Sequence, residues 1–387
     1  MQFAFTDDQN LIRDTAREFL TERASLAQLR KDLATPEAFD PTLWQAMTRE
    51  LGWAGIALPE SVGGSGLGMV ELCVLLEEQG RCLYGGPFLA SAGFASAVLL
   101  ESPASAERDA LLSRLASGEC TAALALTGDS GRADAESVQL DLVDADGGPQ
   151  LQGHASFVLN GAAADTFVMI ARDRRRGRAG FAVAVVPANA QGLRVTALPA
   201  MDLSRPYARV ECHAASASVL AGGDTTVAER GVQIAQVALA AEQLGAMQAV
   251  MDLTTAYVKQ RVQFGRVIGS FQAIKHRLAD MMVICEAARS AAYYAACVVD
   301  EYRADPSSGA AELAEAAALV KVYCSAGFHD VAGNAIQLHG GIGFTWEYDA
   351  HLYFKRARAT SNLLGSPQHH RERIAGLIGL DVLEEVR

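Results

Sequence analysis

The sequence predicts an α+β protein built from a helical part, a β part and a second helical part. Residues 1–120 carry apolar side chains at helical spacing. The next hundred residues contain short β-rich runs split by Gly, Asp and Asn, and long helical patterns return near residue 226. We therefore expect an N-terminal helical domain over 1–120, a middle antiparallel β domain over 121–225 and a C-terminal four-helix bundle over 226–387.

Size and composition are typical of a globular chain with two or three domains, because half of the 387 residues are hydrophobic and a fifth are charged. The formal charge of -12 argues against nucleic-acid binding, which needs basic surface stripes. No apolar run reaches the roughly 18 residues that span a bilayer. The seven cysteines form no CxxC or CxH pair, so we expect free buried thiols in a reducing cytoplasm and no metal site.

The N-terminal part begins with Thr6, which together with the polar residues after it offers N-cap candidates for a first helix. The loop 59–68 is the first strong helix breaker. A helix follows and is expected to end at Gly80 as its C-cap, then an alanine-rich helix over about 88–100 and another ending near Gly118. The apolar face predicted for the first helix consists of Leu11, Ile12, Ala16, Phe19 and Leu20.

The β part contains six short runs at regular spacing, which is typical of an antiparallel sheet or a small barrel. These runs lie at 121–128, 138–148, 155–162, 165–173, 180–193 and 207–214. The long helices of the last part are expected at about 226–260, 268–303, 308–338 and 346–364, with a short helix at the end.

Glu242 is the single carboxylate of an apolar, alanine-rich stretch, and no Lys or Arg lies within seven residues of it. Its neighbours one and two turns away are small, except Leu239. Most glutamates on helices face water, so Glu242 either turns outward or meets an arginine from elsewhere. The alternative is a desolvated carboxylate without a local cation, whose raised pKa would suit a general base.

Two loops carry further chemistry. In the loop 261–266, arginine and glutamine side chains can donate to phosphates, and Phe264 can cover a planar ring. In the loop 337–344, glycines allow close backbone approach, and N–H groups at the start of a following helix suit a diphosphate. This is no Rossmann fingerprint because no strand precedes it. Taken alone, either loop is more typical of a plain structural turn than of a binding site.

Taken together, three segments resemble the acyl-CoA dehydrogenase family, and the resemblance covers the whole chain. They are PESVGGSGLGMVELCVLLEEQGR (59–81), QRVQFGRVIGSFQAIKHRLADM (260–281) and QLHGGIGFTWEYDAHLYFKRA (337–357). The resemblance implies non-covalent FAD and α,β-dehydrogenation of an acyl-CoA thioester. In this reaction a carboxylate removes the α-proton and the flavin takes the β-hydride. It further implies an electron-transfer flavoprotein as acceptor and a homotetramer or a related assembly.

The resemblance also assigns cofactor-binding residues. Thr127, Phe157 and Ser366 would contact the flavin, whereas Leu159 replaces a side chain that donates to flavin N5 in the family. The residues that would contact the adenosine diphosphate half of a flavin held mainly by a neighbouring subunit are Arg261, Gln263, Phe264, Gln272, Gln337, Gly340 and Gly341.

Both places where the family carries its catalytic base lack a carboxylate here. The commoner place corresponds to Leu364, and the other to Ala235. Glu242 lies seven residues, or about two turns, beyond Ala235 on the same helix face. Bacterial relatives that act on steroid side-chain thioesters resemble this chain at Ala-Ala-Glu, so the resemblance favours Glu242 as base.

The small-residue face around Glu242 would open the acyl cavity, so we expect a bulky acyl group, such as a steroid side chain. The weakened flavin face leaves an alternative open, namely the FAD-binding half of a heterotetramer that has little activity alone. A flavin monooxygenase or oxidase on the same fold and a flavin-free structural partner also remain open. Homotetramer and heterotetramer are both compatible with the sequence.

Overall fold

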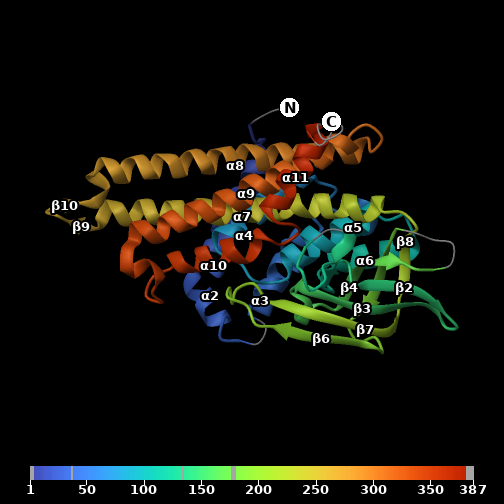
Figure 1. Cartoon of the computed structure of the whole chain (residues 1–387). Helices are drawn as coiled ribbons and strands as arrows, with labels where there is room; N and C mark the ends of the chain where they lie inside the picture. The colour runs from blue at the N-terminus through green and yellow to red at the C-terminus, as the bar shows by residue number, and fades with distance from the viewer. Residues whose placement is uncertain (1–3, 36–37, 133–134, 176–179, 381–387) are drawn as a thin grey trace.

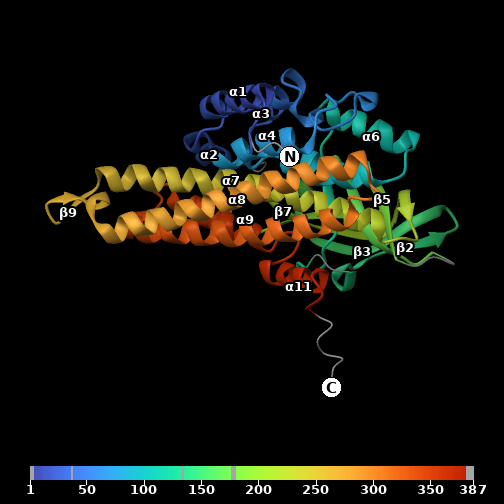
Figure 2. The ribbon, with the colours of Figure 1, turned by 90° about the horizontal axis from the view of Figure 1, so that it is seen from above.

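The structure is a computed structural model, and it describes residues 4–35, 38–132, 135–175 and 180–380. Three long helices run side by side along the molecule, and the strands gather at one end of them (Figure 1). A two-stranded hairpin forms the tip at the opposite end. Seen from above, the N-terminal helices cover one side of the bundle, and helix α11 lies on the other (Figure 2).

The N-terminal part is helical, as predicted. Thr6 caps α1 through a capping box with Gln9. Within the predicted apolar face, Ala16 and Leu20 are buried, but Leu11 is 66% exposed, so the face is narrower than expected. The elements are α1 (Asp7–Arg23), α2 (Leu26–Asp32), α3 (Pro41–Gln45), η1 (Ala46–Glu50), η2 (Trp53–Gly55), η3 (Glu60–Val62), α4 (Met69–Arg81), η4 (Leu89–Ala95), α5 (Ser96–Glu101) and α6 (Ala106–Ala116).

Gly80 is not the C-cap that the sequence predicts. Helix α4 continues through it to Arg81. A Cβ at Gly80 would lie 2.0 Å from the carbonyl oxygen of Glu242, so glycine is needed for close packing of α4 against α7. The need for glycine at position 80 comes from the contact between α4 and α7, and the local sequence carries no sign of that contact.

The middle part is a mainly antiparallel sheet in the order β6-β7-β3-β2-β4-β5-β8. Strand β4 departs from the prediction by pairing parallel to β1 and β2, because the chain reverses at the β2–β3 hairpin and again before β4. Strands β6 and β8 were not predicted; both lie at sheet edges. The strands are β1 (Ala122–Ala125), β2 (Leu140–Ala145), β3 (Gly148–Leu159), β4 (Thr166–Asp173), β5 (Phe181–Pro187), β6 (Leu193–Leu198), β7 (Tyr207–Ser216) and β8 (Ser218–Gly222).

The last part contains the predicted long helices. Helix α7 packs against α4, α5, α8 and α9 and is buried over most of its length. We place the domain limits in the short connections before β1 and before α7. The elements are α7 (Thr226–Gln260), β9 (Val262–Gln263), β10 (Arg266–Val267), η7 (Ile268–Ser270), α8 (Gln272–Ala304), α9 (Ala310–His339), η8 (Gly340–Phe344), α10 (Ala350–Ser361) and α11 (Pro367–Leu377).

The small-residue face of α7 is filled by protein. A Cβ at Gly245 would lie 1.7 Å from the carbonyl oxygen of Glu77 on α4, and one at Gly93 would meet Ala238 at 3.2 Å. The small residues therefore let neighbouring helices approach closely. The prediction that this face opens an acyl cavity is wrong for that reason.

Among the described residues, helix α8 is the one helix long and apolar enough to cross a membrane, although charged residues such as Glu286 and Arg289 interrupt its apolar run. By length and composition alone it qualifies, with a mean hydropathy of 1.3 over its best window. It runs alongside α7 and α9 in the bundle, and 39% of that window is buried. None of the seven cysteines is in a disulfide, and all are buried except Cys82 and Cys297, which are partly exposed.

Candidate functional site

A cavity of about 580 Å³ lies between the sheet and the turn that joins α10 to α11. This volume falls within the range of small-molecule and cofactor sites. Thr127, Phe157 and Ser366, which the sequence assigns to the flavin, all line it. The remaining lining residues are Ser130, Gly131, Arg132, Leu198, Pro199, Ala200, Met201, Tyr207, Arg358, Ala359, Asn362 and Leu363.

A bulge in strand β3 brings Phe157 to this cavity. The pairing of β3 with β7 slips between Ala155 and Val158, and Phe157 takes a φ of 56°. Bulges of this kind re-aim a side chain beside functional sites. The ring stays 43% exposed, whereas Leu159 is buried and does not line the cavity. A half-exposed aromatic ring on a cavity wall suits a planar ligand such as a flavin ring.

The described residues that line the cavity include no carboxylate. Leu364, at the place where the family carries its base, is 3% exposed and has a φ of 57°. Left-handed backbone is uncommon for leucine and persists where surrounding structure holds it. The ionisable side chains on the walls are Arg132, Arg358 and Tyr207, and burial raises the pKa of Tyr207 well above its ordinary value.

Glu242 is buried, 2% exposed, and lies in a cluster of charges. Its Oε1 accepts hydrogen bonds from Arg205, in the turn between β6 and β7, and from Arg356 of α10, while Oε2 accepts none from the described residues. The alternative of a desolvated carboxylate without a neighbouring cation is therefore wrong. Both arginines come from distant sequence, and the reading in which Glu242 meets such an arginine is confirmed. Glu242 is absent from the cavity lining.

Arg356 ties the three parts of the chain together. Its Nε donates to Asp202 at 2.7 Å, and its Nη2 donates to the carbonyls of Leu83 and Ser204, both at 2.9 Å. Burial alone would lower the pKa of Arg356, but Asp202 and Glu242 raise it. For Arg205, burial and the charge of Arg356 prevail, so its pKa is lowered.

Sequence reasoning did not identify Arg205 and Arg356 as partners of Glu242. The sequence holds an indirect signal, because Asp202 and Arg205 form a charged turn between two strands, and Arg356 follows apolar residues at a buried helical position. A buried guanidinium needs an anion. Which anion it meets depends on how the sheet docks on the bundle.

The residues assigned to a neighbour's FAD lie far from the cavity. Arg261, Gln263 and Phe264 belong to the hairpin β9–β10 at the tip of the bundle, opposite the sheet (Figure 1). Phe264 is 91% exposed. The 19 residues from Glu242 to Arg261 span about 28 Å of helix. Within one chain, these residues and the cavity cannot contact the same flavin ring.

The second assigned loop lies beside the hairpin. Tyr257, one turn before Arg261, stacks on His339 with ring centroids 4.3 Å apart, and its hydroxyl donates to the carbonyl of His339. Within this loop, Gly340–Phe344 form a five-residue 3₁₀ turn, and the next α-helix, α10, begins only at Ala350 and not directly after the glycines as predicted. A Cβ at Gly340 or Gly341 would meet nothing within 4 Å, so the backbone there faces open space. Gln272 and Gln337 are also exposed.

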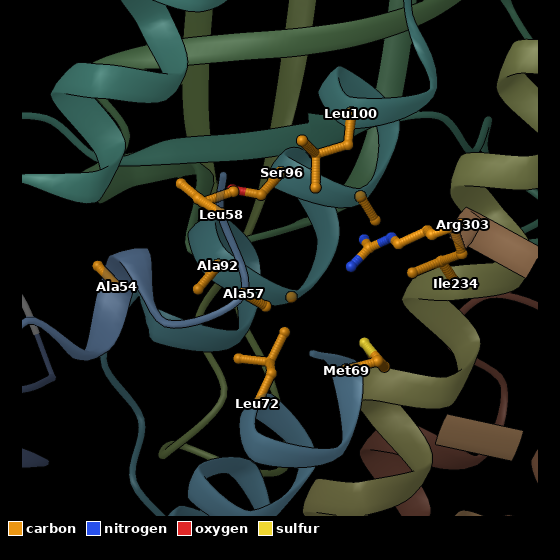
Figure 3. A pocket seen from close by; sticks show the side chains of 12 residues that line it. Ala54, Ala57, Leu58, Met69, Leu72, Ala92, Ser96, Leu100, Ile234 and Arg303 are labelled. Atoms are coloured by element: carbon orange, nitrogen blue, oxygen red, sulfur yellow. The ribbon is translucent and has the colours of Figure 1, made fainter. Parts of the chain in front are cut away.

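A smaller cavity lies between the N-terminal helices, α7 and the end of α8, and Arg303 points into it (Figure 3). Its walls are otherwise mostly aliphatic, including Leu72, Leu100 and Ile234. Its volume of about 10 Å³ holds about one water molecule. It is too small for a cofactor or an acyl group.

Comparison with known proteins agrees with this architecture. Residues 6–119 match the acyl-CoA dehydrogenase N-terminal domain, and residues 225–378 match the C-terminal domain. Acyl-CoA dehydrogenase IpdE2 of Mycolicibacterium smegmatis is 33% identical over 95% of this chain and 98% of its own length.

Two solved structures extend the likeness. The Tcur3481-Tcur3483 steroid ACAD is 28% identical with a TM-score of 0.85, over 97% of this chain and 99% of that one. The ChsE4-ChsE5 complex of Mycobacterium tuberculosis is 26% identical with a TM-score of 0.87, and the match covers both chains fully. With two matching domains and full-length relatives, the chain belongs to the acyl-CoA dehydrogenase family.

Proposed function

We propose that this chain is an FAD-binding subunit of an acyl-CoA dehydrogenase that oxidises the Cα–Cβ bond of an acyl-CoA thioester. Family membership supports the reaction. The observation that carries the subunit role is the cavity, whose described walls suit a flat ring but include no carboxylate to take the α-proton.

In this proposal FAD, when bound, supplies the hydride acceptor. Phe157 and Thr127 line the ring site on the side of the sheet, and the Thr127 hydroxyl donates to the carbonyl of Ser156 at 2.7 Å. Asn362 and Ser366 offer polar groups from the turn between α10 and α11. The exposed hairpin and glycine loop at the far tip would hold the adenosine diphosphate half of a neighbour's FAD. Each FAD would thus be shared between two subunits, which explains why the cavity residues and the hairpin residues of one chain lie far apart.

The α-proton needs a base, and the position of Glu242 as that base stays a prediction. Its one bonded oxygen is shared by two buried guanidinium groups, and it does not line the cavity. The geometry therefore supports a base from a second, related chain. Similarity to the ChsE4-ChsE5 complex supports such a hetero-oligomer, and a tetramer is the assembly we propose.

The substrate we propose is a bulky acyl-CoA, such as a steroid side-chain thioester. Support comes from the likeness to the Tcur3481-Tcur3483 steroid ACAD. The small-residue face of α7 gives no such support, because protein fills it and it does not form a cavity. An electron-transfer flavoprotein would reoxidise the flavin. The unpaired cysteines fit a reducing cytoplasm, where we place the protein.

The test is to purify the chain alone and together with a co-expressed related chain, then quantify flavin and mix each with acyl-CoA without oxygen. We expect bleaching of the flavin absorbance only in the two-chain complex. Full reduction by the single chain would contradict the subunit role. Bound flavin that no acyl-CoA reduces, even in the complex, would favour a monooxygenase or oxidase.

A further inference from the structure

The turn between α10 and α11 carries one wall of the cavity, and side chains from α7, α9 and α11 hold it. The last carbonyls of a helix lack partners inside the helix. Here the carbonyl of Thr360 accepts from Gln243, and that of Ser361 accepts from Lys321. The carbonyl of Leu364 accepts from Gln236 and interacts with His370.

Lys321 is the unusual member of this set. Its side chain is fully buried in α9, in an otherwise apolar stretch. The nitrogen donates to the hydroxyl of Ser325 at 2.7 Å and to the carbonyl of Ser361 at 2.8 Å. In the described part of the chain, no carboxylate forms an ion pair with it. The end of a helix, with its exposed carbonyls, is a favourable place for such a donor.

The two acceptors match a neutral amine, which has two N–H groups, better than an ammonium, which has three. Burial lowers the pKa of Lys321 to about 7. The titratable groups acting on it are Cys324 of its own helix and His370 of α11. Burial lowers the pKa of His370 to about 3, so this ring stays neutral at pH 7. From α7 and α10, the contacting groups are the neutral Gln243, through Ser325, and the Ser361 carbonyl.

A continuous chain of hydrogen bonds runs from Lys321 into the wall. Ser325 donates to Gln243 at 3.0 Å, Gln243 donates to the hydroxyl of Thr360 at 3.0 Å, and that hydroxyl donates to the carbonyl of Arg356. These contacts join α7, α9 and α10 just before the turn. The left-handed backbone at Leu364 needs outside support, which Gln236 and His370 supply at its carbonyl.

We propose that Lys321 is a positioning residue for the cavity wall: by holding the carbonyl of Ser361, it sets where Asn362 and Ser366 face the bound flavin and acyl group. The role rests on the function proposed above, because it assigns this cavity to those ligands. Lys321 itself contacts neither ligand. It acts through the turn, whose residues line the cavity.

The test compares the holoprotein, with its partner chain, to Lys321→Met. Methionine keeps the volume but cannot donate to Ser361. Losing a buried hydrogen bond of this kind shifts the equilibrium between the closed and the locally open turn about tenfold towards the open form. We expect amide hydrogen exchange of the peptide over 359–366 to become about tenfold faster. We also expect KM to rise by a larger factor than kcat falls. In the parent, KM should change with pH near pH 7, where Lys321 titrates, and this change should be absent in the variant.

Two control variants separate this role from general weakening. Ser325→Ala removes the other partner of the amine and its link to Gln243 but leaves Ser361 bonded, so exchange of the turn should rise clearly less than in Lys321→Met. Lys31→Met, at an exposed site on α2, should change nothing. Unchanged turn exchange in Lys321→Met would overturn the proposal. So would an equal effect of Ser325→Ala, which would mark Lys321 as a core residue only.

The exchange measurement also distinguishes this proposal from the proposed function. If acyl-CoA never reduces the flavin but turn exchange still depends on Lys321, the function fails and the positioning role stands. If reduction occurs and neither exchange nor KM responds, the positioning role fails alone.

Discussion

Two consecutive residues of α7, Glu242 and Gln243, face two different buried polar regions. Each region buries basic side chains, and the two regions compensate the charge of these side chains in different ways. Glu242 and Asp202 form a cluster with two arginines, Arg205 and Arg356. Gln243, about 100° further round the helix, joins a network whose one ionisable base, Lys321, has only neutral partners. Arginine cannot lose its proton inside a protein, so it needs anions, whereas a buried lysine can become neutral.

This difference bears on function. A carboxylate that neutralises two arginines at the joint of three domains is already committed, so it makes a poor general base. A buried amine with dipolar partners can hold a turn without bringing a permanent charge beside the cavity. The four predictions below test this contrast from the largest expected effect to the smallest.

Glu242→Gln should destabilise the fold by about 3–5 kcal/mol, because two buried guanidinium groups lose their shared anion. Urea unfolding of the variant and parent measures this difference. Glu22→Gln, on an exposed position of α1, is the matched control and should stay within about 0.5 kcal/mol. A fully stable Glu242→Gln protein that binds flavin but has lost dehydrogenation would instead support Glu242 as the base.

Gly245→Ala should cost about 1–3 kcal/mol, because the new Cβ meets the Glu77 carbonyl and pushes α4 from α7. This prediction tests whether close packing against α4 fixes the position of α7, so that Glu242 and Gln243 face separate polar regions. Thermal unfolding measures the loss. A neutral substitution would mean that the small-residue face has free space after all.

Lys321→Met should change how stability depends on pH. The folded-state pKa is lowered from 10.5 to about 7, so between these values the unfolded chain binds more protons. The unfavourable contribution is complete below pH 7 and is relieved as pH rises. Relative to the variant, the parent should gain up to about 1.4 kcal/mol per pH unit between pH 7 and 8.5. Parallel pH curves for both proteins would show that Lys321 does not titrate in this range.

Gly333→Ala should stabilise the protein by about 0.5–1 kcal/mol, the ordinary gain for replacing glycine within a helix. A Cβ there meets only Phe354, at 4.0 Å. The same substitution thus has opposite signs on α9 and α7. Loss of stability at Gly333 would show that α9, which carries Lys321, is packed more tightly than its contacts indicate.

Elements with local signals were predicted well. Thr6 with Gln9 marks the start of α1, and α7 begins and ends where the apolar pattern does. Edge strands β6 and β8 were missed because partly exposed strands have weak patterns. At the site, Thr127, Phe157 and Ser366 were placed in one cavity by family signature. The partners of Glu242 and the role of Lys321 were not visible, since they depend on contacts between segments far apart in the chain.

The sequence alone determined the order of helical and β parts, the family, and the absence of a carboxylate at positions 235 and 364, because these follow from local residue identity. Only the tertiary structure decided that Glu242 neutralises Arg205 and Arg356, that α4 fills the small-residue face, and that Lys321 holds the Ser361 carbonyl. The physical reason is that burial and charge pairing are set by which surfaces meet, and these polar partners, which lie 37 to 114 positions apart in the chain, meet only after folding.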